Sequence, residues 1–94
     1  MTAELLKRDA IRIGPVGWSQ RDYYRVDPPI EGSGIVAVSR ACVFGALETY
    51  IFGATEALDG FESLELDGSR KGDIKPADLL RELGYTVNES EVTL

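Results

Sequence analysis

The apolar positions near the start of the chain recur at helical spacing. Ala3, Leu6, Ala10 and Ile13 lie three or four residues apart, which predicts an amphipathic helix over residues 3–13. Gly14-Pro15 would end it, because proline disfavours helical geometry in the residue before it.

A second, longer apolar region runs from Ile35 to Phe52. Apolar residues occupy nearly every position, and Arg40 and Glu48, eight residues apart, mark one narrow polar stripe. This pattern predicts a central helix that is buried on several sides or covered by a partner, so a homodimer through this helix is an additional expectation. Gly45 is costly inside a helix and indicates close packing there.

The end of the chain carries local helix signals. Pro76 suits a first helical position, and Gly84 suits the residue after a helix. The pattern predicts a last helix between them, with Tyr85 folded back on Leu80. Residues 53–60 read as a continued or separate helix, 63–67 as helix or strand, and 86–94 as a frayed tail or a short strand.

The segment between the first two predicted helices is rich in aromatic residues. It reads as a loop followed by a short extended piece near Asp22–Val26, or as a helical turn capped by Ser19. Trp18 is interpreted as a core residue that closes the end of the domain, with a binding anchor as the alternative. Tyr23 and Tyr24 are further candidates for contacts with a partner, because aromatic residues are enriched at binding hot spots.

Together these elements predict a mainly α fold. Three or four helices form one small globular domain over residues 1–94, around the central apolar helix, with at most a small β element.

The composition excludes several kinds of catalytic and metal site. The 94 residues include no histidine and one cysteine, which excludes a histidine base, a histidine metal ligand and an internal disulfide. Without a histidine to activate a serine, and with little volume for a deep pocket, we expect no enzyme, no cofactor and no metal. We find no secretory signal and no membrane span in the pattern, and therefore expect a cytoplasmic protein.

The charge is unevenly distributed. Residues 1–47 carry six basic and five acidic side chains, and residues 48–94 carry four and eleven, which together give the net charge of −6. The acidic half is either a solvated surface or a surface for a basic partner. The candidate acids are Glu56, Asp59, Glu62 and Glu65. Direct binding of nucleic acid is not expected, because no cluster of Lys and Arg is present.

Two short motifs resemble a family of small uncharacterised proteins of actinobacteria and their phages. They are Gly17-Trp18-Ser19-Gln20 and Ala41-Cys42-Val43-Phe44-Gly45-Ala46-Leu47, with Tyr23 or Tyr24 between them. The family pattern is Gly-Trp-(Thr/Ser)-Gln followed by Cys-x-x-Gly-Ala. The chain departs from it at Arg21, where glycine is frequent, and over 67–73, before the last helix.

The resemblance implies no activity and no cofactor, but it favours a phage accessory protein that acts in the cytoplasm of the host. The resulting expectation is a non-enzymatic protein-interaction module that binds and modulates a host protein. The alternative is an acidic decoy that mimics nucleic acid and occupies a basic DNA-binding protein.

Overall fold

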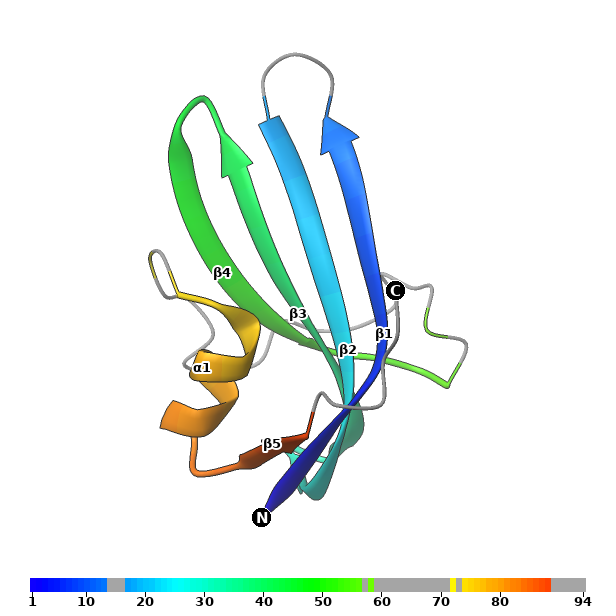
Figure 1. The fold of residues 1–94 in the computed structure, drawn as a ribbon. Helices are drawn as coiled ribbons and strands as arrows, with labels where there is room; N and C mark the ends of the chain where they lie inside the picture. Colours follow the sequence, from blue (N-terminus) through cyan, green and yellow to red (C-terminus); the bar gives the residue numbers. More distant parts are fainter. Residues whose placement is uncertain (14–16, 57, 59–71, 73, 89–94) are drawn as a thin grey trace.

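The described part of the protein forms one twisted sheet with a single short helix against one of its faces, as the computed structural model shows (Figure 1). The structure describes residues 1–13, 17–56, 58, 72 and 74–88. The sheet order is β4-β3-β2-β1-β5. β1 to β4 are antiparallel neighbours, and β5 runs parallel to β1. The elements are β1 (Thr2–Ile13), β2 (Gly17–Ile30), β3 (Ser33–Val43), β4 (Ala46–Gly53), α1 (Pro76–Glu82) and β5 (Thr86–Asn88).

The predicted mainly α fold is therefore wrong, and β1 shows one reason. The register passes from Leu5 opposite Tyr24 to Arg8 opposite Asp22, with an irregularity between Leu5 and Lys7. Residues directly opposite each other share a face, so one face receives residues 3, 5, 8 and 10. The additional residue interrupts the two-residue alternation of a strand once, with a spacing of three between residues 5 and 8, so the segment lacks the regular alternation that indicates a strand.

The predicted central helix is also wrong, because residues 35–52 form β3, a tight turn and β4. Ile35 and Ala37 are buried on one face of β3, and Val36 and Val38 are buried on the other. A strand covered on both faces has a continuous apolar sequence, which periodicity alone does not distinguish from a buried helix.

Gly45 serves the turn between β3 and β4 and not a helix contact. Phe44 and Gly45 both have positive φ angles, 51° and 82°, as the favoured two-residue hairpin turn requires. The homodimer expected through a central helix loses its basis, since this segment is a hairpin within the sheet.

The last helix is confirmed as α1. Pro76 occupies its first turn, and Gly84 follows it with a φ of 99°. The Tyr85 N–H donates to the Leu80 carbonyl at 3.0 Å and the Gly84 N–H to the Arg81 carbonyl at 2.9 Å, which satisfies carbonyls at the helix end. Residues 86–88 form the short strand β5, one of the two alternatives open for the tail. The extended piece expected near 22–26 lies inside the longer β2.

The core lies between α1 and the lower half of the sheet. Leu79 and Leu80 of the helix pack with Leu5, Tyr24 and other buried residues of β1 to β4. β1 and β2, and β3 and β4, extend together well beyond the helix (Figure 1). After β4 the chain contacts the opposite face of the sheet, where the Lys7 ammonium donates to the Leu58 carbonyl at 3.3 Å. The alternatives for 63–67 lie outside the described residues.

Candidate functional site

The face of the sheet that carries α1 changes character along the strands. Cross-strand neighbours form successive rows, since residues opposite each other share a face. Nearest the helix the row is Leu5, Tyr24, Val36 and Gly53, and the next is Arg8, Asp22, Val38 and Ile51. Beyond it lie Ala10, Gln20, Arg40 and Thr49, and then Trp18, Cys42 and Leu47. The sheet thus passes from an apolar core through a polar band to an aromatic end.

Asp22 is the centre of the polar band. Its carboxylate is 1% exposed and accepts two hydrogen bonds from the Arg8 guanidinium, at 3.0 Å from Nε and 2.9 Å from Nη2. The Gln20 amide donates a third at 3.1 Å. This bidentate pairing places a positive charge next to the buried carboxylate. It also joins one side chain of β1, Arg8, to one side chain of β2, Asp22, in a defined geometry.

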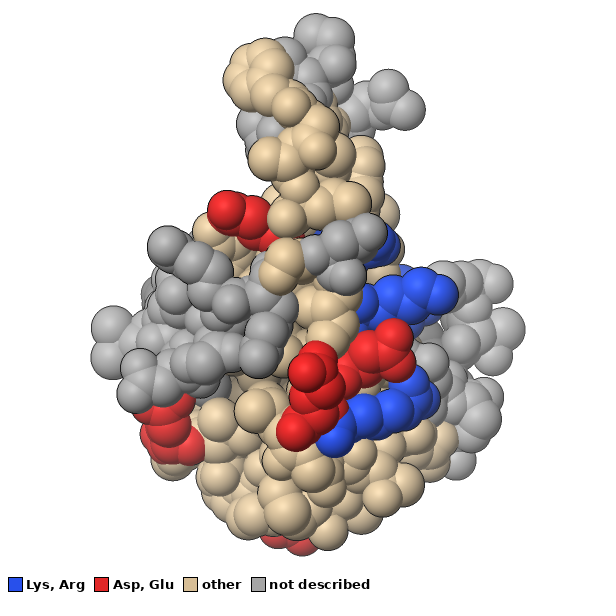
Figure 2. All heavy atoms as spheres, turned by 90° about the vertical axis from the view of Figure 1, so that its left-hand side faces the viewer, with Lys and Arg blue, Asp and Glu red and all other residues tan. Residues whose placement is uncertain are grey.

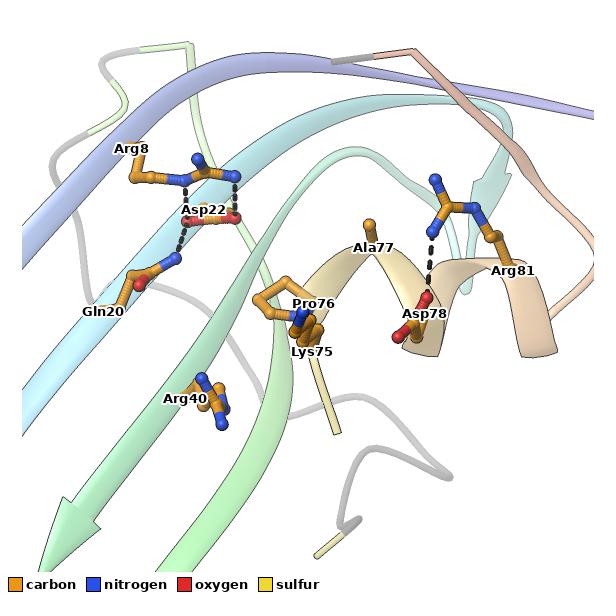
Figure 3. A pocket seen from close by; sticks show the side chains of 9 residues that line it. All are labelled: Arg8, Gln20, Asp22, Arg40, Lys75, Pro76, Ala77, Asp78 and Arg81. Atoms are coloured by element: carbon orange, nitrogen blue, oxygen red, sulfur yellow. Dashed lines mark hydrogen bonds and ion pairs between the residues drawn. The ribbon is translucent and has the colours of Figure 1, made fainter. Parts of the chain in front are cut away.

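A cavity of about 400 Å³ lies between this band and the beginning of α1. Figure 3 shows side chains from β1, β2, β3 and the helix around it. The basic residues among its described lining are Arg8, Arg40, Lys75 and Arg81, and the acidic ones are Asp22 and Asp78. Arg81 pairs with Asp78 at 2.9 Å on the exposed surface of the helix. The described lining therefore has two more positive than negative charges, although the whole chain is acidic.

Trp18 connects the cavity to the end of the hairpins. The centre of its ring lies 5.5 Å from the Arg40 guanidinium carbon, within the range of a cation–π contact. Trp18 is 37% exposed, so it is not a core residue and belongs to the surface of this end.

Phe44 occupies the tip of the neighbouring hairpin and is 82% exposed. Seen from the side of the helix, charged side chains gather over the body of the molecule, while the described part of the narrow tip is uncharged at its end (Figure 2). The structure thus presents two aromatic side chains, Phe44 and Trp18, on the projecting hairpins.

Tyr23 and Tyr24 are both fully buried, on opposite faces of β2. Tyr24 belongs to the core under α1. The Lys7 ammonium lies 6.0 Å from the centre of the Tyr23 ring. The Tyr23 hydroxyl is buried without a hydrogen-bond partner in the described part of the chain. Neither tyrosine is accessible to a partner in this structure.

The acidic candidates are only partly placed. Glu56 is exposed just after β4, whereas Asp59, Glu62 and Glu65 lie outside the described residues. The structure therefore does not bring these acids together as a described surface.

Sequence reasoning missed the polar band, because its members are far apart in the chain. The signal was alternation in β2, where Trp18, Gln20 and Asp22 stand at every second position and share one face. Arg8 joins them only through the register of the β1–β2 hairpin.

Among the described residues, no group of three or more Cys, Asp or Glu side chains is arranged to hold a metal ion. The one described helix is too short to cross a membrane. No family model, curated protein or solved structure matches the chain.

Proposed function

We propose that the protein is a non-enzymatic interaction module that binds another protein through the end of its two projecting hairpins. The carrying observation is the exposure of Phe44 and Trp18 at that end. The resemblance to actinobacterial and phage proteins favours a host protein as the partner and the cytoplasm as the compartment.

The hairpins suit this role because their backbone places both aromatic residues before binding. Phe44 lies in a two-residue turn between paired strands, and Trp18 stacks on Arg40 from a neighbouring strand. Less conformational entropy is lost on binding when the backbone of the contact residues is already in place. Aromatic residues with large contact areas are also the typical energetic centres of interfaces.

The chemistry of the cavity favours binding over catalysis. Asp22 is the buried carboxylate in its described lining, and both its oxygens already accept hydrogen bonds from Arg8 or Gln20. A general base must reach the proton that it removes. Asp22 is instead held as the fixed partner of Arg8.

The test is affinity capture from a host lysate at low and moderate salt, with mass spectrometry of the retained proteins. We expect one partner at both salt concentrations. Trp18→Ala and Phe44→Ala should each weaken its binding by about 30-fold, the effect of losing about 2 kcal/mol at a hot spot.

Leu83→Ala is the matched control, because Leu83 is also 37% exposed but lies at the end of α1 away from the hairpin tips. Equal effects of Trp18→Ala and Leu83→Ala would contradict the proposed surface. Retention of many basic proteins at low salt alone would contradict a specific module and favour the acidic decoy.

A further inference from the structure

We infer that the cavity beside α1 receives the carboxylate of an aspartate or glutamate side chain from the protein partner. The inference rests on the proposed function and assigns the chemistry of one contact. It starts from Lys75, a cation of the described cavity lining in a protein of net charge −6. An acidic group is attracted locally, while the remaining surface opposes non-specific binding of anions.

Lys75 supplies a positive charge that an entering carboxylate can contact. It is exposed immediately before α1, and its ammonium makes no ion pair within the described residues. Arg8, by contrast, is bound in two places to Asp22, and Arg81 is paired with Asp78. A carboxylate entering the cavity therefore meets the Lys75 ammonium without having to displace an existing carboxylate.

Gln20 makes an amino acid a better ligand than a simple anion. Asp22 can only accept hydrogen bonds when ionised, so the NH₂ group of Gln20 must face it. This orientation leaves the carbonyl oxygen of Gln20, a residue that lines the cavity, with no hydrogen bond inside the described structure. An acidic residue of a peptide offers a carboxylate for Lys75 together with backbone N–H donors for Gln20. Inorganic phosphate offers no backbone N–H donor.

The cavity adjoins the proposed interface. Arg40 lines the cavity, and the same guanidinium stacks under Trp18. An acidic residue in the cavity therefore places its neighbours along the partner chain near the Trp18 ring. The expected recognition element is an acidic side chain next to an apolar one.

The experiment is an NMR titration of the whole chain with N-acetylglutamate N′-methylamide, followed through the Gln20 side-chain amide and the Trp18 indole. N-acetylglutamine N′-methylamide is the matched uncharged probe, and inorganic phosphate is the third. We expect saturable binding of the glutamate probe, at least about tenfold tighter than that of the other two, as a charge-assisted contact provides.

The variants are Lys75→Gln and Arg25→Gln. Each removes one exposed positive charge, but Arg25 lies on β2 and is not part of the described cavity lining. Lys75→Gln should weaken binding of the glutamate probe about three- to fivefold, as loss of one exposed ion pair predicts. Arg25→Gln should leave the affinity for the glutamate probe unchanged. Unaltered backbone spectra establish that both variants are folded.

Equal binding of the glutamate and glutamine probes would overturn the inference, and so would equal effects of the two variants. Tighter binding of phosphate would overturn the assignment to a carboxylate. None of these results bears on whether the capture experiment retains a partner. Loss of the partner on Trp18→Ala with no response to the glutamate probe would leave the proposed function standing without this contact.

Discussion

Asp22 illustrates how single residues solve a local electrostatic problem. A carboxylate that is 1% exposed loses its hydration, which is costly unless an opposite charge and hydrogen-bond donors replace the water. Arg8 and Gln20 provide both, from the neighbouring strand and from the same strand. The arrangement places a fixed charged pair between the apolar core and the hairpin ends.

We therefore expect Asp22→Asn to lower the free energy of unfolding by about 2 kcal/mol, because Arg8 would lose its counter-charge in a partly buried site. The value is below that of a fully buried pair, since the Arg8 side chain is 30% exposed. Urea denaturation measures the change in the free energy of unfolding. The control is Asp78→Asn, which breaks an exposed pair with Arg81 and should change stability by no more than about 0.5 kcal/mol. Similar losses in the two variants would contradict this account of Asp22.

The β3–β4 hairpin shows how one turn determines the structure of a whole segment. The predominantly apolar segment from Ile35 to Phe52 reverses its direction at Phe44 and Gly45, which both have positive φ angles. A glycine tolerates this backbone geometry, and a residue with a Cβ atom is strained in it. Gly45 therefore decides where the tip lies and which residue it displays.

Gly45→Ala should lower the free energy of unfolding by about 1 kcal/mol, because alanine is disfavoured at a φ of 82°. Apart from its two chain neighbours, no described residue has an atom within 4 Å of the position of an added Cβ, so backbone strain is the expected cause. Gly34→Ala is the control, since Gly34 in β3 is equally open and does not have a positive φ. It should be neutral or slightly stabilising. A loss at Gly34 as large as that at Gly45 would contradict the explanation by turn geometry.

The elements differ in how far the sequence alone predicts them. α1 was predictable because its signals are local: proline at one end, glycine at the other and apolar residues on one side. The strands were not, because the bulge in β1 interrupts the two-residue alternation and β3 is buried on both faces. The polar band was unpredictable for the same reason, since Arg8 meets Asp22 only once the hairpin register exists.

At the scale of the whole molecule, Tyr85 joins the end of the chain to the sheet. Its hydroxyl donates to the Pro28 carbonyl at 2.5 Å, which links residues 57 positions apart. Burial of the side chain raises the Tyr85 pKa above its ordinary value of 10.0, and the nearby negative charge of Asp27 adds to this. The folded protein thus holds the phenolic proton more strongly than the unfolded chain does.

This difference predicts a loss of stability at high pH. Because the folded-state pKa is the higher one, the contribution of Tyr85 is complete below pH 10 and is lost as the pH rises through the folded-state pKa. Tyr85→Phe should cost about 1 kcal/mol near neutral pH, through loss of the hydrogen bond. Denaturation at about pH 8 and about pH 11 should show a smaller alkaline loss in Tyr85→Phe than in the native protein. An equal alkaline loss would show that other groups cause it.

The sequence by itself determined the last helix, the negative net charge and the lack of histidine chemistry, because these depend on residue identity or on signals within a few positions. The tertiary structure decided the class of the fold, the burial of Tyr23 and Tyr24, the exposure of Trp18 and which described residues line the cavity. Each of these depends on strand pairing between residues distant in the chain. A shift of register by one residue would move every side chain to the other face of the sheet.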